Sequence, residues 1–330
     1  MLLSGVGYAL LAGLMWGLIF VGPLIVPEYP ALLQSFGRYL ALGIIALPIA
    51  WLGRKRLKQL SLHDWFMAFK LSTVGNIIYY LCLASAIQRT GAPISTMIIG
   101  TLPVVIPVCA NLAYSQRDGK LPWSRLAPAL VVIILGLILV NSAELRHGVP
   151  GFSWGRYLSG IALALVAVAS WAWFALRNGR WLRENPDKNP LVWATAQGLA
   201  ILPLSLLGYG LSCLWLHHST PDFALPFGPR PGVFLLLMLA IAILCSWLGN
   251  LCWNIASQRL PTVLVGPLIV FETLAGLLYA FILRHHMPPL MTLCGIGCLI
   301  IGVVIAVRVK PRPVQVVPVV VEKTCNSKGV

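Results

Sequence analysis

The chain has 330 residues, of which 58% are hydrophobic and only 10% charged, and its mean hydropathy is +0.86. Soluble proteins commonly have about a quarter of their residues charged, so this composition excludes a soluble globule and indicates a polytopic membrane protein. The net charge of +15 does not indicate a nucleic-acid partner, because the basic residues are scattered among short loops instead of sharing a face with aromatic or polar groups.

The first apolar run, MLLSGVGYALLAGLMW, has no basic region before it and no cleavage site after it. We therefore expect it to be retained as a membrane span and not removed as a signal peptide. A helix of about 20 apolar residues crosses a bilayer, and apolar runs of about this length predict ten transmembrane helices. Their predicted ranges are residues 3–26, 32–52, 65–87, 93–114, 126–141, 157–176, 190–214, 232–255, 261–283 and 290–307. The predicted fold is an all-α polytopic membrane protein.

The distribution of Lys and Arg predicts the orientation of these helices. With the N-terminus inside, 17 of the 24 Lys and Arg residues lie in the inner segments and five in the outer ones, while Arg38 and Lys70 lie within predicted spans. Cytoplasmic loops of membrane proteins accumulate Lys and Arg. We therefore expect a multi-pass protein of the bacterial inner membrane with both termini in the cytoplasm.

Short matching segments indicate an internal repeat. Trp16 of the first predicted span matches Trp171 of the sixth at an offset of 155 residues, and LCLASAIQR at 81–89 matches LCWNIASQR at 251–259 at an offset of 170. Two further pairs recur at an offset of 166, namely Pro122 with Pro288 and Gly136 with Gly302. Each repeat has five helices, an odd number, so the second repeat enters the membrane from the opposite side. Inverted repeats are typical of transporters that rock about a site at the membrane midplane.

The predicted domains follow from this repeat. Residues 1–142 form the first five-helix repeat, residues 143–156 an external linker and residues 157–308 the second repeat. The remaining tail at 309–330 contains three Pro residues and no periodicity. We therefore predict that the tail is disordered in the cytoplasm.

One carboxylate lies deep in a predicted span. Glu272 is eleven residues from Pro261, about 16 Å along a helix and close to the midplane of a hydrocarbon core about 30 Å thick. Ionisable groups at this depth are costly and are functional by default, so Glu272 is interpreted as a proton-accepting or cation-pairing group in a cavity. The alternative is a permanently neutral or ion-paired Glu that fixes the packing between helices.

The segments GLMWGLIF, GRYLALG and YYLCLASAIQRTGAPISTMIIGTLPV, with their echoes in the second half of the chain, resemble the EamA family of the drug/metabolite transporter superfamily. The resemblance spans roughly residues 3–307. It implies a bundle of ten helices in two inverted five-helix repeats, an inner-membrane location, and efflux of small metabolites, often amino acids and related compounds, through a central cavity. The family's second half often has Pro where this chain has Glu272, whereas Pro103 keeps the corresponding place in the first half.

Arg38 is the second charged candidate, about seven residues into the second predicted span. One interpretation is that Arg38 pairs with Glu272 or with a substrate carboxylate, which the fork of a guanidinium suits. The other is that it snorkels toward the outer headgroups or caps a neighbouring helix.

Polar and aromatic residues cluster at related depths in the third and eighth predicted spans. These residues are Asn76, Tyr79 and Tyr80 in the third span and Asn250, Trp253 and Asn254 in the eighth. Polar side chains in a span turn inward, where they line a wet cavity or bond to another helix. Trp16 and Trp171 either line the same cavity or pack between helices. We take all eight as candidate cavity residues, with Glu272 and Arg38 as candidate coupling or charge-pairing residues.

The sequence argues against an enzyme and against a metal or cofactor site. All six His residues fall in or beside predicted loops, so no His-dependent catalytic or metal constellation is predicted within the membrane. Glu272 is the only deep carboxylate, which excludes a paired-aspartate protease. Cys294 and Cys298 are four residues apart, but packing of small residues is favoured over a soft-metal site.

We therefore expect a secondary exporter of small polar or amphipathic metabolites, amino acids or their derivatives first among them, that works by alternating access. No GxxxxGK[ST] loop occurs in the sequence, so the expected energy source is a gradient or a downhill leak. The expected partners are a small-molecule substrate, the lipid bilayer and a coupling proton, with a homodimer as a further candidate and no nucleic acid. The alternatives are a non-transporting membrane scaffold and metal-ion efflux through converging Cys residues.

Overall fold

The computed structural model describes residues 2–20, 22–90, 95, 98–113, 122–145, 153–260, 262–284 and 289–308. Every regular element in these ranges is a helix, which confirms the all-α prediction. The tail predicted at 309–330 lies outside the described residues, and so does the part of the predicted linker at 146–152.

The first half of the described chain forms helices of very different lengths. They are α1 (Leu2–Gly17), η1 (Leu18–Phe20), α2 (Gly22–Ile25), α3 (Ala31–Leu52), α4 (Arg54–Leu57), α5 (Leu62–Ser72), η2 (Thr73–Ile78), α6 (Tyr79–Thr90), α8 (Leu102–Ala113) and α10 (Trp123–Leu145). The first predicted span is thus divided, because α1 ends at Gly17 and a short 3₁₀ turn follows.

The second half contains the longest helices of the described chain. Its elements are α11 (Trp154–Glu184), α12 (Pro190–Ser219), α13 (Pro231–Ile241), η3 (Ala242–Leu248), α14 (Gly249–Arg259), α15 (Thr262–Leu268), α16 (Val270–Arg284) and α17 (Leu290–Arg308). The start of α12 follows from its sequence, because Asn189 Oδ1 accepts the amide of Leu191 and Pro190 occupies the first helical position, where its missing N–H costs nothing.

Several helices are long and apolar enough to cross a membrane. Within the described residues there are five of them, Ala31–Leu52, Leu62–Thr90, Trp154–Glu184, Pro190–Ser219 and Pro231–Arg259. Five shorter apolar helices, Leu3–Gly17, Leu102–Leu112, Leu126–Val140, Leu264–Tyr279 and Leu290–Ala306, lie within the other predicted spans. The chain is therefore a helical protein with many apolar membrane segments.

Two of the long helices contain a π-helical segment in their middle. In η2 the amide of Tyr79 donates to Val74 O, five residues back, and in η3 the amide of Gly249 donates to Leu244 O, also five residues back. Tyr79 and Gly249 are 170 residues apart, which is the offset of the repeated LC…QR segments. Segments of π-helix are rare and frequently occur at functional sites.

The ninth predicted span is broken in its middle. Pro267 lies in the last turn of α15, which ends at Leu268, and α16 begins at Val270. Proline inside a helix removes one ladder hydrogen bond and clashes with the preceding turn. Two residues after Pro267 the α-helical pattern is interrupted, because the amide of Ile269 donates to Gly266 O, three residues back. As a result, Glu272 lies in the first turn of α16 instead of the middle of a continuous helix.

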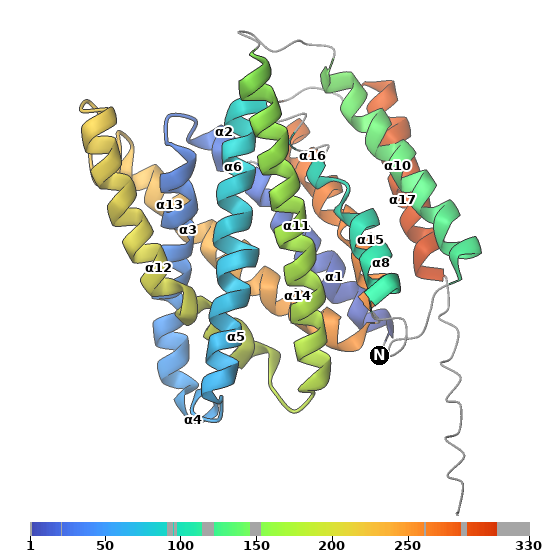
Figure 1. Cartoon of the computed structure of the whole chain (residues 1–330), viewed down its shortest axis with the longest axis horizontal. Coiled ribbons are helices and arrows are strands. Elements are labelled where there is room, and N and C mark those ends of the chain that lie inside the picture. The colour runs from blue at the N-terminus through green and yellow to red at the C-terminus, as the bar shows by residue number, and fades with distance from the viewer. Residues whose placement is uncertain are drawn as a thin grey trace, which may run out of the picture.

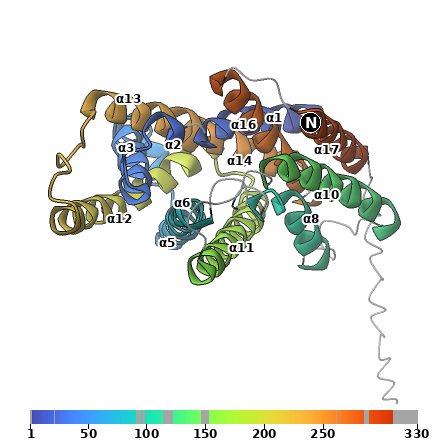
Figure 2. The same cartoon turned by 90° about the horizontal axis from the view of Figure 1, so that it is seen from above.

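The helices pack in pairs that join distant parts of the chain. Figure 1 shows α10 beside α17 at one edge of the bundle, and Figure 2 shows α3, α12 and α13 together at the opposite side. In addition, α6 packs on α11, α1 on α14 and α16, and α8 on α15. The α10–α17 pair approaches backbone to backbone, because a Cβ added to Gly295 would lie 2.8 Å from the carbonyl oxygen of Gly136. Small residues allow such close approach of helices in lipid.

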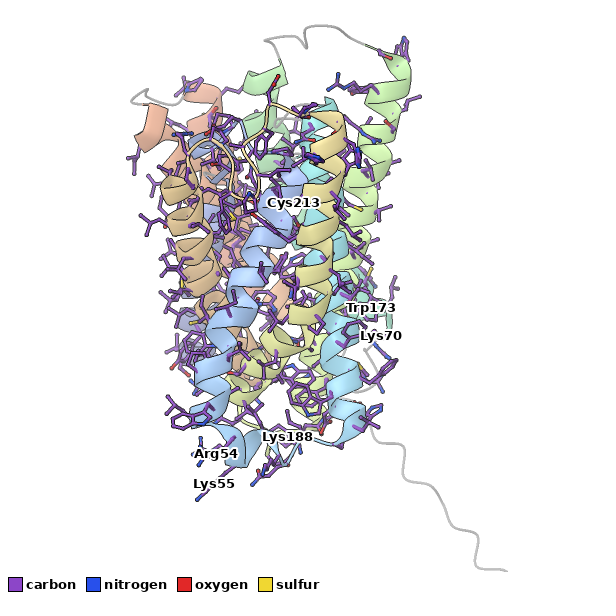
Figure 3. All side chains as sticks on the ribbon, turned by 90° about the vertical axis from the view of Figure 1, so that its left-hand side faces the viewer. Arg54, Lys55, Lys70, Trp173, Lys188 and Cys213 are labelled. Atoms are coloured by element: carbon purple, nitrogen blue, oxygen red, sulfur yellow. The ribbon has the colours of Figure 1, made fainter. Side chains whose placement is uncertain are left out.

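The outer face of the bundle carries exposed apolar side chains, and basic side chains gather at one end. Leu207 and Leu236 are 65% and 69% exposed, which suits contact with lipid. Figure 3 shows Arg54, Lys55 and Lys188 together at one end of the bundle. This is the end that the count of Lys and Arg residues predicts to be cytoplasmic.

Candidate functional site

A small cavity lies in the bundle, where η2, α14 and the first turn of α16 meet α1, α3 and α11. Its volume is about 20 Å³, room for about one water molecule. The lining residues are Trp16, Ile19, Arg38, Tyr39, Gly75, Asn76, Tyr79, Trp171, Asn250 and Glu272. Seven of the ten residues that the sequence analysis selected are therefore brought to one place.

A basic and an acidic side chain, Arg38 and Glu272, line this cavity without forming an ion pair. Arg38 of α3 is 5% exposed and Glu272 of α16 is 7% exposed. The described ion pairs, which join charged atoms within 4.0 Å, do not include this pair. Within the described part of the chain, the Glu272 carboxyl group also has no hydrogen bond from a side chain or a backbone amide. Its position in the first turn of α16 faces the positive end of the helix dipole, which favours a negative charge.

Arg38 is fixed from two directions. Its Nε donates to Ser246 Oγ of η3 at 2.7 Å, and its Cζ lies 5.0 Å and 5.2 Å from the ring centroids of Tyr39 and Tyr80, within the range of a cation–π interaction. Arg38 therefore does not snorkel to the outer headgroups, because its partners lie on helices in the bundle interior. Tyr80 itself is not among the lining residues.

Aromatic rings form one wall of the cavity. Trp16 lies edge-on to Trp171 with ring centroids 5.2 Å apart, and Tyr79 stacks on Trp171 at 5.4 Å. Trp253 packs behind Trp16 at 5.1 Å and does not line the cavity. Trp16 is held in place because its Nε1 donates to the carbonyl oxygen of Cys245 at 2.8 Å.

The amide side chains divide between two places. Asn76 and Asn250 line the cavity. Asn254, one turn beyond Asn250, instead accepts a hydrogen bond at 2.8 Å from Asn178 Nδ2 of α11. Asn178 Oδ1 in turn accepts hydrogen bonds from Trp193 and Gln197 of α12. For Asn254, the interpretation as a bond between helices therefore fits the structure, and the one as a cavity residue does not.

Sequence reasoning did not select Ile19, Tyr39, Gly75 or Ser246. Tyr39 follows Arg38 directly, and Ser246 lies one turn before Asn250 on the same helix. Helical spacing could have indicated Ser246, since residues four apart share a face. No sequence signal identifies Gly75, whose place depends on the close approach of Phe174 from α11.

Metal-binding side chains do not gather in the described residues. No group of three or more His, Cys, Asp or Glu residues is close enough there to hold an ion. Cys294 is exposed, and Cys298 lies one turn away on α17.

The chain is similar in sequence to known proteins. The model of the EamA-like transporter family matches residues 3–142. The Escherichia coli (strain K12) protein named "Inner membrane protein YtfF" is 74% identical over 311 residues, which is 94% of this chain and 97% of that protein. The chain belongs to the EamA-like transporter family. It is therefore a membrane protein of a transporter family, in agreement with the resemblance found in the sequence.

Two further proteins are similar to this chain at lower identity. The Bacillus subtilis (strain 168) protein named "Uncharacterized transporter YetK" is 22% identical over 310 residues, covering 93% of this chain and 87% of that protein. A solved crystal structure superposes with a TM-score of 0.70 over 93% of this chain and 97% of its own, at 17% identity. At that identity the likeness shows the fold alone.

Proposed function

We propose that this transporter-family protein exports small metabolites, amino acids or their derivatives, across the bacterial inner membrane by alternating access. The proposal rests on one observation. A buried guanidinium, that of Arg38, and a buried carboxyl group, that of Glu272, line the same cavity among aromatic rings without pairing. Intramembrane charges are costly unless they have a partner or a task, so this arrangement fits a substrate that supplies partners to both.

In this proposal the architecture is ten spans in two inverted five-helix repeats, residues 1–142 and 157–308, joined by an external linker at 143–156. The pairing of helices supports it. Exchanging the first five spans with the last five leaves the α3–α12, α8–α15 and α10–α17 pairs in place and interchanges α6–α11 with α1–α14. The two π-helical segments also recur at the repeat offset of 170 residues. The cluster of basic residues at one end supports cytoplasmic termini (Figure 3).

Alternating access requires the site to open and close, and the cavity fits a closed arrangement. A space for about one water molecule holds no metabolite, so the walls must separate to admit one. The π-helical segment η2 lines the cavity with Gly75 and Asn76, and two further lining residues, Asn250 and Glu272, follow closely after η3 and after the break at Ile269. Irregular backbone is tolerated at membrane depth where it lines a cavity. We assign the hinges to these three places.

Glu272 is the proposed coupling or charge-pairing residue. It either carries a coupling proton or pairs with an ammonium group of the substrate, while Arg38 pairs with an anionic group. Trp16, Trp171 and Tyr79 offer their faces to the apolar or cationic part of the substrate. Asn76 and Asn250 supply uncharged hydrogen-bonding groups.

Two observations favour transport over the alternatives. A scaffold whose polar residues only bond helices explains Asn178 and Asn254, but it gives no reason for the unpaired Glu272 in a cavity. Metal efflux requires converging ligands, and no His, Cys, Asp or Glu group of three gathers in the described residues.

The test is transport by the purified protein in liposomes. Wild type is offered a panel of labelled amino acids and other metabolites, with and without a pH gradient, beside Glu272→Gln and the control Glu184→Gln. Glu184 is a good control because it lies in an exposed pair with Arg180 at the end of α11. We expect Glu272→Gln to lose transport or its response to the pH gradient, and the control to retain both. Equal rates and an equal pH response in Glu272→Gln would contradict the role of Glu272, and a wild type that moves no compound would favour a scaffold.

A further inference from the structure

Among the described residues, the guanidinium of Arg38 makes one hydrogen bond, and it does so through Nε. Nε donates to Ser246 Oγ at 2.7 Å, across 208 positions of sequence, and Ser246 is itself only 3% exposed. The two terminal nitrogens, Nη1 and Nη2, donate no hydrogen bond to any residue that the structure describes. Four of the five N–H donors of the guanidinium are thus left for another group.

The surroundings of Arg38 determine where those donors are held. The rings of Tyr39 and Tyr80, at 5.0 Å and 5.2 Å from Cζ, and the hydroxyl of Ser246 leave the guanidinium little freedom to turn. Arg38 is also one of the residues that line the cavity. A guanidinium that is held at Nε still has both terminal nitrogens for a bidentate contact, the geometry in which Arg recognises a carboxylate.

The acidic side chain nearest in the cavity lining, Glu272, does not form an ion pair with the terminal nitrogens of Arg38. Glu272 is the acidic residue of the cavity lining, and its carboxyl oxygens lie beyond the 4.0 Å of an ion pair. Of the other lining residues, Asn76 and Asn250 have uncharged amide side chains and so offer no negative charge to Arg38. Because Arg38 lines the cavity, a ligand that enters there can supply acceptors for these donors.

We propose that Ser246 is a positioning residue that aims the terminal nitrogens of Arg38 at an anionic group, a carboxylate, of the transported compound. The inference rests on the proposed function and adds a residue and a chemical requirement to it. Ser246 lies in the π-helical segment η3, so the local helix geometry sets where its hydroxyl meets Arg38. Ser246→Ala removes the acceptor for Nε and lets the guanidinium turn away from the carboxylate.

The experiment measures the half-saturating concentration and the maximal rate in proteoliposomes for each amino acid that wild type transports. Each labelled amino acid is competed with its own unlabelled form and with its carboxamide, which is nearly the same size but lacks the anionic group. The variants are Ser246→Ala, Ser246→Thr, which keeps the hydroxyl, and Ser205→Ala. Ser205 is a matched control, because it is buried and its hydroxyl donates to Ile201 O within α12.

For Ser246→Ala we expect the half-saturating concentration of the amino acid to rise about tenfold, the loss of one hydrogen bond to a charged group. The maximal rate and the competition by the carboxamide should stay within about twofold, and Ser246→Thr should restore the wild-type value. A purely structural role instead lowers the maximal rate for every compound, and that result, or no change at all, would overturn the inference. If wild type transports no compound of the panel, the proposed function fails and this inference fails with it, whereas transport of uncharged metabolites alone would overturn this inference only.

Discussion

The indole Nε1 of Trp16 donates to the carbonyl oxygen of Cys245 at 2.8 Å, whereas the buried indole Nε1 of Trp171, its counterpart in the repeat, has no hydrogen-bond partner among the residues that the structure describes. The π-helical segment η3 explains the first bond. The amide of Gly249 bypasses Cys245 O and donates to Leu244 O, so the Cys245 carbonyl can accept from Trp16. A Cβ on Gly249 would lie 2.7 Å from Trp16 Nε1, so this contact also needs the glycine.

This asymmetry predicts different effects of the same Trp-to-Phe substitution at the two positions. Trp16→Phe removes the donor and should lower the free energy of unfolding by about 1 kcal/mol. Trp171→Phe removes a donor that has no partner, so it should leave stability unchanged or raise it slightly. Unfolding midpoints of both variants in the same detergent provide the check, and equal losses in the two variants would contradict the asymmetry.

The contact between α10 and α17 predicts a strong effect of a single methyl group. In Gly295→Ala the new Cβ would meet Gly136 O and Val140 N at 2.8 Å, and backbone atoms cannot move aside as a side chain does. We expect a loss of about 1–3 kcal/mol in the free energy of unfolding. Gly297→Ala is the matched control on the same helix, because a Cβ there has nothing within 4 Å. The argument fails if the two variants unfold at the same midpoint.

The hydrogen-bond network at Asn178 predicts graded losses of stability. Asn178→Ala leaves the indole N–H of Trp193 and the amide of Gln197 without their shared acceptor, at a cost of about 1–3 kcal/mol in the free energy of unfolding. Asn254→Ala removes the acceptor of Asn178 Nδ2. It also removes Asn254 Nδ2, a buried donor without a partner among the described residues. The loss in the free energy of unfolding should therefore be clearly smaller than for Asn178→Ala. Chemical or thermal unfolding of the two variants measures the order, and the reverse order would show that Oδ1 of Asn178 is not the centre of the network.

An ion pair outside the membrane segments predicts a pH effect. Arg230 Nε donates to Glu28 Oε1 at 2.5 Å, and this hydrogen bond holds the pKa of Glu28 below its ordinary value of 4.5. A carboxyl group with a lowered pKa contributes stability above its ordinary pKa, and that contribution is lost as the pH falls through the lowered pKa. The difference in Tm between wild type and Glu28→Gln should therefore be present at neutral pH and vanish in acid. Both groups are exposed, so we expect a small difference, and a difference that persists in acid would exclude the ion pair as its cause.

The positions of the membrane segments could be predicted from the sequence because the signal for each is local. A span needs about 20 apolar residues and satisfies its own backbone hydrogen bonds, so the range 32–52 and the described helix Ala31–Leu52 agree closely. The π-helical segments had no such signal, although the repeat offset of 170 residues relates their positions.

The composition of the candidate site was decided only by the tertiary structure. Asn250 and Asn254 are equivalent in sequence terms, one turn apart and both polar, yet Asn250 lines the cavity and Asn254 bonds to Asn178 of α11. The cavity has room for about one water molecule, whereas one helical turn advances about 5.4 Å along the axis. A side chain one turn away therefore meets a different neighbour. Likewise, the pairing of Arg38 with Ser246 joins two helices 208 residues apart. The apolar segments and the repeat offsets could therefore be found in the sequence. The contacts between polar side chains depend instead on how helices from distant parts of the chain pack together.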